Sequence, residues 1–145
     1  MYKGIKLTNK EMRYIALFES VTGATVVDCI VDDRLNRIIF VIKEGDAGLA
    51  IGKRGKNIAL LEKMTGKKHE IIEFSDNPTQ FIKNALKPAT VREVRMIQRL
   101  DGKPVAVVTV EPRDKGVAIG RNGRNAERLR FLAKRYFRIE NVSIM

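Results

Sequence analysis

In the first half of the chain, apolar positions recur at helical spacing in two segments, and three further short segments predict strands. The sequence Thr-Asn-Lys-Glu at 8–11 matches a capping box, and apolar side chains then recur at helical spacing until Gly23. Two segments rich in β-branched residues flank a polar turn and predict a hairpin. The predicted elements are a helix between Thr8 and Gly23, strands over 25–31 and 37–42, a helix from Ile58 that ends at Gly66, and a strand over 70–74.

The second half of the chain repeats this order of elements. Asn77 and Pro78 supply an N-cap and a favoured first helical residue, and Pro88 ends the helix that they begin. The remaining predicted elements are strands over 93–100 and 105–110 around an Asp-Gly turn, an amphipathic helix through 126–136 and a strand over 138–144.

One segment of the second half, 91–100, fits two periodicities. Its apolar residues are spaced like one face of a helix. A constant offset of 68 residues nevertheless aligns Val94 and Ile97 with Val26 and Cys29, which lie in the first predicted hairpin. We therefore predict a strand for this segment.

The same offset superposes two copies of a short segment that contains a Gly-x-x-Gly turn. The first copy is Asp46-Ala-Gly-Leu-Ala-Ile-Gly-Lys-Arg-Gly-Lys-Asn57, and the second is Asp114-Lys-Gly-Val-Ala-Ile-Gly-Arg-Asn-Gly-Arg-Asn125. Each copy has Ala-Ile directly before the turn, a basic residue and an asparagine after it, and an amphipathic helix beyond. Two glycines three residues apart are common by chance, so the duplication is what predicts a repeated nucleic-acid clamp.

Length and charge narrow the possibilities further. A chain of 145 residues with a repeat of about 70 residues indicates two domains, which we place at 1–75 and 76–145. The net charge of +11 favours polyanionic partners. Residues 1–75 hold 13 basic and 10 acidic residues, whereas residues 76–145 hold 15 and 7. The second domain is therefore expected to be the stronger phosphate binder.

Several residue types are scarce, which argues against common enzymatic sites. Cys29 is the only cysteine, so we expect a buried structural thiol and a reducing, cytoplasmic location. His69 is the only histidine, follows two lysines and is expected at the surface. Neither a His/Cys metal cluster nor a Ser-His-Asp triad can be assembled, and 48–54 lacks the spacing of a P-loop. We expect no catalysis, no cofactor, no metal and no membrane partner, since no run of about 18 apolar residues occurs.

Each turn has the chemistry of a site for a sugar-phosphate backbone. Glycine corners permit unusual backbone conformations and let a ligand approach without a Cβ in the way. The helix that follows presents unpaired N–H groups and the positive end of its dipole to an anion. Adjacent apolar residues are candidates for the floor of a groove that holds unstacked bases. The candidate RNA-binding residues are Ile51, Gly52, Lys53, Arg54, Gly55 and Lys56 in the first copy, and Ile119, Gly120, Arg121, Asn122, Gly123, Arg124 and Arg128 in the second.

Structural alternatives stay open for each of these features. The turns can be plain connections between helices. Ile51 and Ile119 can be core residues, because a groove floor and a core wall have the same composition. The basic run from Arg121 to Arg135 can be a solvated helix face with Glu127 as an ion-pair partner.

The order of elements and the Ile-Gly-x-x-Gly segments resemble the K-homology (KH) domain in its type II arrangement, and a chain of two such domains resembles archaeal NusA-like proteins. The resemblance implies an α+β fold, an α/β sandwich in which each domain runs α-β-β-α-α-β around a mixed three-stranded sheet. It also implies that a monomer binds single-stranded nascent RNA in transcription elongation, termination or antitermination. RNA polymerase is then a candidate partner.

Other functions remain open at this point. Bacterial NusA carries an N-terminal polymerase-binding region and an S1 domain, and 145 residues leave room for neither. A ribosome-associated or ribosome-assembly KH protein is therefore the main alternative. A nucleotide-dependent enzyme is a third.

Overall fold

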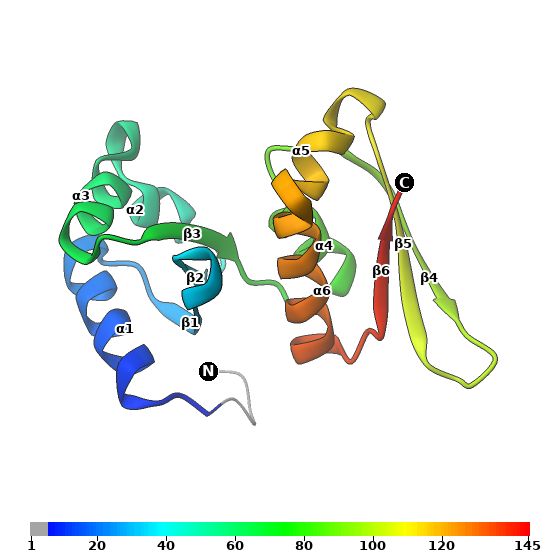
Figure 1. Ribbon diagram of the computed structural model, residues 1–145, viewed down its shortest axis with the longest axis horizontal. Coiled ribbons are helices and arrows are strands. Elements are labelled where there is room, and N and C mark those ends of the chain that lie inside the picture. The colour runs from blue at the N-terminus through cyan, green and yellow to red at the C-terminus, as the bar shows by residue number, and fades with distance from the viewer. Residues whose placement is uncertain (1–5) are drawn as a thin grey trace. The chain divides into compact units, whose positions relative to one another are not determined.

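The computed structural model describes residues 6–145, which form two compact units (Figure 1). The first unit ends at Ser75, and the second runs from Asp76 to Met145. Each unit has one three-stranded sheet and three α-helices, in the order α-β-β-α-α-β. The α+β fold expected from the sequence is thereby confirmed.

The first unit is built around the strand β2. Its elements are α1 (Asn9–Thr22), β1 (Val26–Asp32), β2 (Arg37–Ile42), α2 (Ala47–Ile51), α3 (Lys56–Thr65) and β3 (Lys68–Glu73). The central strand β2 pairs antiparallel with β1 and parallel with β3, so Phe40 lies opposite both Cys29 and Ile71. Every residue of β2 is buried, which accounts for its almost continuous apolar sequence.

The core of the first unit joins its helices to one face of the sheet. Phe18 of α1 stacks on Phe40 of β2 with ring centroids 4.1 Å apart. Leu61 of α3 and Ala50 of α2 belong to the same cluster and are fully buried. Truncation of a buried phenylalanine such as Phe40 to alanine is expected to cost about 3 to 5 kcal/mol of stability.

The second unit repeats this topology. Its elements are α4 (Pro78–Leu86), β4 (Val91–Gln98), β5 (Pro104–Val110), α5 (Lys115–Ile119), α6 (Arg124–Phe137) and β6 (Asn141–Ile144). The central strand β5 pairs antiparallel with β4 and parallel with β6. The ambiguous segment is thus a strand, as the repeat predicted. The Asn77 side chain caps α4 by accepting a hydrogen bond from the backbone N–H of Gln80 at 3.0 Å, which confirms the predicted cap.

The apolar faces of α4 and α6 form the core of the second unit with β5. Phe81, Leu129, Leu132 and Tyr136 are buried, and the rings of Phe81 and Tyr136 meet edge to face at 5.4 Å. The predicted helix face through 126–136 is confirmed. The predicted strand over 138–144 begins later, at Asn141, because Arg138 takes a left-handed conformation as the C-cap of α6.

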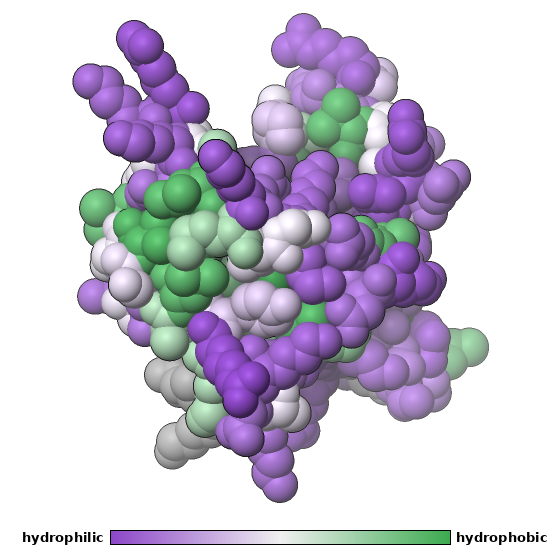
Figure 2. All heavy atoms as spheres, turned by 60° about the vertical axis from the view of Figure 1, so that its left-hand side comes forward, coloured by the Kyte–Doolittle hydropathy of each residue, from purple (hydrophilic) through white to green (hydrophobic). Residues whose placement is uncertain are grey.

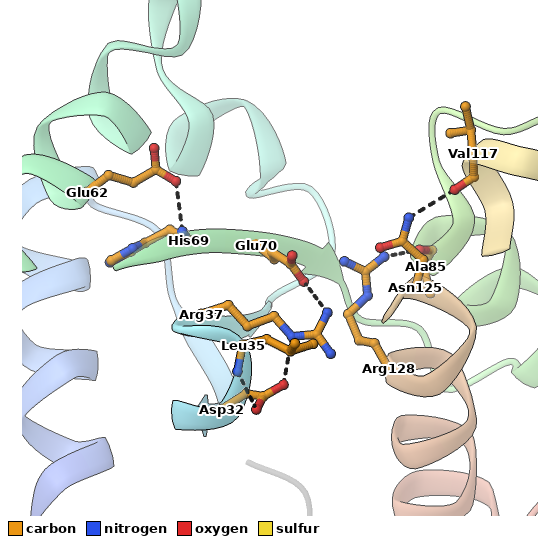
Figure 3. A network of polar contacts seen from close by, with 10 residues as sticks. All are labelled: Asp32, Leu35, Arg37, Glu62, His69, Glu70, Ala85, Val117, Asn125 and Arg128. Atoms are coloured by element: carbon orange, nitrogen blue, oxygen red, sulfur yellow. Dashed lines mark hydrogen bonds and ion pairs between the residues drawn. The ribbon is translucent and has the colours of Figure 1, made fainter. Parts of the chain in front are cut away.

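Two predictions for the first unit are wrong. Thr8 precedes α1 as expected, but its side chain makes no capping hydrogen bond, so the capping box is not formed. His69 is buried rather than at the surface, because the parallel register of β3 places it beside Phe40, with ring centroids 5.4 Å apart. Burial lowers the pKa of His69. Its backbone N–H donates to Glu62 (Figure 3).

Cys29 is buried, as expected for a structural thiol. Loss of hydration raises its pKa to about 12, and the neighbouring carboxylate of Asp28 adds to this rise. The thiolate is the reactive form of cysteine, so this side chain is chemically inert at neutral pH.

Candidate nucleic-acid interface

The first Gly-x-x-Gly segment forms a tight turn between two helices. Helix α2 ends at Ile51, and Gly52 follows with φ 78° and ψ 169°. Arg54 and Gly55 are both left-handed, with φ values of 55° and 72°. The backbone N–H of Gly55 donates to the Gly52 carbonyl at 3.1 Å, and α3 begins at the next residue. Four residues, Gly52 to Gly55, therefore make the whole connection between α2 and α3.

The second Gly-x-x-Gly segment has the same backbone conformation. Gly120 has φ 80° and ψ 167°, and Asn122 and Gly123 are left-handed, with φ values of 55° and 76°. Gly123 donates to the Gly120 carbonyl at 3.0 Å, and α6 begins directly afterwards. The repeated sequence thus specifies a repeated loop geometry.

The first glycine of each loop is required on two grounds. Its φ and ψ lie in a region that is almost restricted to glycine. A Cβ on Gly52 would lie 2.8 Å from the side-chain Cγ and Nδ2 of Asn57, and a Cβ on Gly120 would meet Asn125 at the same distances. A Cβ on Gly55 or Gly123 would meet nothing within 4 Å, so the second glycine is required by its positive φ alone.

Each loop leads into a helix whose first turn has no side-chain cap. Helix α3 has 10 residues and α6 has 14, so both carry a dipole whose positive end lies at the loop. Among the hydrogen bonds of residues 6–145, none uses the backbone N–H of Lys53 or Arg121, the residues after the first glycines. Open N–H groups and the positive end of a helix dipole attract anions in general.

The side chains of the loops are exposed cations and amides. Lys53, Arg54 and Lys56 project from the first loop, and Arg121 and Asn122 from the second. Within the part of the chain that the structure describes, no carboxylate pairs with these four cations. Their positive charge is therefore available to a ligand.

One aspartate fixes the start of each copy, although no chemical role could be predicted for it from its sequence position. Asp46 accepts a hydrogen bond from the backbone N–H of Thr25 at 2.8 Å, and Asp114 accepts one from Thr90 at 2.9 Å. Both bonds tie the segment before the loop to the start of the first strand of the same unit. The recurrence of aspartate at this position of the repeat is the signal that identifies them.

The apolar residues beside the loops are divided between core and surface. Ala50 and Ala118 are buried, whereas Leu49, Ile51 and Val117 are about half exposed. The core interpretation of Ile51 is therefore wrong, and Ile119 is partly buried. Figure 2 shows hydrophobic surface next to projecting hydrophilic side chains on the first unit. The exposed large apolar residues of α2 and α3 are Leu49, Ile51, Leu60 and Met64.

The basic run along α6 does not form a single solvated face. Arg128 donates from Nη2 to the Ala85 carbonyl at 2.8 Å (Figure 3), and Arg130 donates from Nε to the Val142 carbonyl at 2.9 Å. The guanidinium of Arg135 lies over the Phe131 ring. Part of this charge is thus fixed within the second unit. The assignment of Arg128 to RNA stays a prediction, with one of its donors already engaged.

Across 6–145, no group of three or more His, Cys, Asp and Glu side chains is placed to hold a metal ion. No helix within that range is long and apolar enough to cross a bilayer.

Comparison with known proteins assigns a domain family to each unit. Residues 12–76 match the KH domain, and residues 78–144 match the NusA-like second KH domain. The chain is 39% identical to the "Probable transcription termination protein NusA" of Halococcus morrhuae, over 97% of this chain and 98% of the relative. The protein of the same name from Methanocaldococcus jannaschii is 34% identical over 97% of this chain and 75% of its own length.

A solved structure agrees with this assignment. The crystal structure of APE1850 superposes with a TM-score of 0.83 at 39% identity and covers 96% of this chain and 100% of its own. The chain therefore belongs to the NusA family of proteins with two KH domains.

Proposed function

We propose that this protein binds single-stranded, nascent RNA through both Gly-x-x-Gly loops and acts in transcription termination or antitermination. The relatives named above are probable transcription termination proteins, which favours this role over one in ribosome assembly. The protein works as a monomeric binding factor beside RNA polymerase in the cytoplasm, and it catalyses no reaction.

The observation that carries this proposal is the recurrence of one anion-binding geometry. Two loops with the same backbone angles each precede an uncapped helix and carry exposed cations, which are Lys53, Arg54 and Lys56 in the first loop and Arg121 in the second. Lys53, Arg54 and Lys56 contact phosphates in the first unit, and Arg121 and Arg124 do so in the second. Asn122 donates a hydrogen bond to the backbone of the RNA.

The bases lie against the apolar side chains beside each loop. Ile51 is 44% exposed, and Ile119 at the corresponding position is partly exposed. Single-stranded RNA is recognised by proteins through bases that are unstacked and packed on such surfaces, while the loop of a KH domain clamps about four nucleotides by their backbone.

Charge reversal in the loops tests this proposal. The variants Lys53→Asp with Arg54→Asp, and Arg121→Asp with Asn122→Asp, are expected to weaken binding of single-stranded RNA by about 10- to 100-fold each, because they set carboxylates beside phosphates. The fold is expected to persist, since these side chains are exposed. Fluorescence anisotropy measures the affinity, and circular dichroism checks the fold.

A matched control separates local contact from net charge. Arg99→Asp with Lys103→Asp changes the net charge as much as the first variant, at the tip of the β4–β5 hairpin. This tip belongs to the second unit. Strand β5 runs from the tip toward the second Gly-x-x-Gly loop, so the tip and that loop lie at opposite ends of β5. This control is expected to change RNA affinity much less. If all three variants bind RNA equally well, the loops are not the binding site.

A further inference from the structure

Each Gly-x-x-Gly loop is spanned by an asparagine that the chemistry of phosphate binding does not require. Asn57 donates from its side-chain Nδ2 to the Leu49 carbonyl at 2.8 Å. Asn125 makes the same bond to the Val117 carbonyl at 2.9 Å (Figure 3). Donor and acceptor are eight residues apart in both copies, and the loop lies between them.

The bond joins the end of one helix to the start of the next. Leu49 belongs to the last turn of α2, where carbonyls have no partner within the helix. Asn57 is the second residue of α3. The same amide packs against Gly52, so closely that a Cβ at Gly52 would overlap it. Asn57, Gly52 and the end of α2 are therefore packed against one another. Asn125 and Gly120 make the same contacts at the end of α5.

The bond also explains why the N–H group after the first glycine is left open. If α2 continued, the N–H of Lys53 would donate to the Leu49 carbonyl, four residues earlier. The Asn57 side chain occupies that carbonyl instead. The helix ends, the chain turns at Gly52, and the Lys53 N–H remains for a ligand. In the second copy, the Asn125 side chain likewise occupies the Val117 carbonyl, and the Arg121 N–H remains for a ligand.

We propose that Asn57 and Asn125 are positioning residues that hold each loop in its RNA-binding conformation before RNA arrives. This inference rests on the proposed function of the loops. A loop that is ordered in advance loses less conformational entropy on binding, so its affinity is higher. Neither asparagine touches RNA through the amide nitrogen that holds the loop.

The test replaces each asparagine in the 145-residue protein and measures both RNA affinity and loop conformation. Asn57→Ala and Asn125→Ala are each expected to weaken binding of single-stranded RNA by about tenfold. In the RNA-free protein, the NMR amide signals of Gly52 and Gly55 should shift in the first variant, and those of Gly120 and Gly123 in the second. Asn57→Asp keeps the size of the side chain but cannot donate to the carbonyl, and it is expected to behave in the same way.

Asn36→Ala is the matched control for a merely structural effect. Asn36 also donates its amide to a backbone carbonyl, that of Gly66, and it lies at the β1–β2 turn of the same unit. Asn36→Ala should lower the thermal stability without changing RNA affinity or the loop glycine signals. If Asn57→Ala binds RNA like the wild type while the loop charge reversals do not, the positioning role is wrong and the binding site stands. If the charge reversals also leave binding intact, the proposed function fails, and this inference fails with it.

Discussion

The two Gly-x-x-Gly loops are nearly superposable in backbone conformation, whereas the units that carry them differ in charge and in surface. The first glycines differ by about 2° in φ and in ψ, and both loops are closed by the same asparagine bond. Residues 1–75 carry a net charge of +3, and residues 76–145 carry +8. The shared loop geometry indicates a shared task, and the differences indicate how the units divide it.

The helix after each loop shows the clearest difference between the units. In α3, Leu60 and Met64 are exposed apolar residues. At the positions equivalent under the 68-residue offset, α6 has Arg128 and the buried Leu132. Helix α3 thus exposes two apolar side chains at positions where α6 has a partly buried arginine and a buried leucine. Contacts with bases should contribute more to RNA affinity in the first unit, and contacts with phosphates should contribute more in the second.

The hairpin tips differ as well. In the first unit, Asp33 at the tip accepts hydrogen bonds from Lys10 of α1 at 3.0 Å and from Lys67 at 3.4 Å. In the second unit, Leu100 at the tip is fully exposed, and Arg99 pairs with Asp101 inside the same turn. Helix α1 has 14 residues and α4 has 9, so the first hairpin has the longer helix beside it. The loops are alike even though their surroundings are not.

Alanine at the two glycines of a loop should separate their roles. Gly52→Ala is expected to destabilise the first unit by about 3 kcal/mol, because it combines a restricted backbone region with a clash against Asn57. Gly55→Ala should cost about 1 kcal/mol, since only its left-handed conformation is disfavoured. Gly120→Ala and Gly123→Ala should show the same order. Thermal or denaturant unfolding measures these values, and equal costs at both glycines would contradict the loop geometry.

The buried histidine should make only the first unit sensitive to mild acid. Burial lowers the pKa of His69 in the folded state, so the unfolded chain binds a proton first as the pH falls below about 6.5. The stability from the neutral, buried imidazole is present above that pH and is lost below it. Native-state hydrogen exchange between pH 7 and pH 5 should show weakening of core amides in the first unit. His69→Gln should flatten this dependence, and an unchanged profile in that variant would contradict the assignment.

Exchange of the left-handed residues inside the loops should have the smallest effect. Arg54 and Asn122 both have φ 55°, and asparagine tolerates this conformation better than arginine. Arg54→Asn is expected to raise the stability of the first unit by about 0.5 kcal/mol, and Asn122→Arg to lower that of the second by a similar amount. Opposite signs in thermal unfolding would agree with equal loop geometry. Equal signs would show that side-chain contacts outweigh the backbone preference.

The repeat made most of the fold predictable from the sequence, because each ambiguous segment could be compared with its counterpart. Segment 91–100 fitted both a helix and a strand, and only the offset of 68 residues decided in favour of β4. The burial of His69 could not be predicted in this way, because two lysines precede it and the parallel register with β2 places it in the core. The sequence also held no direct sign that Arg128 would bind the Ala85 carbonyl, since that contact joins two helices far apart in the chain.

The sequence predicted the loop at the site but not the hydrogen bonds that hold the loop in place. Glycine spacing and basic residues identified the turn and the helix start. The bonds of Asp46 and Asn57 depend on where the strands and helices meet in space. Aspartate and asparagine recur at the same positions of the second copy, which indicates that these residue types are needed there but does not show which hydrogen bonds they make. Ile51 could not be assigned to core or surface, because both alternatives have the same composition.

The salt dependence of RNA binding tests the central claim most directly. Two variants of the two-domain protein, each with one loop disabled, are titrated with single-stranded RNA over a range of salt concentrations. One variant is Lys53→Asp with Arg54→Asp, and the other is Arg121→Asp with Asn122→Asp. The protein that keeps only the second loop should bind more tightly and give the steeper log-log slope, about −2 to −3 for three or four phosphate contacts. Equal slopes in the two proteins, or a flat response with the second loop intact, would contradict the account.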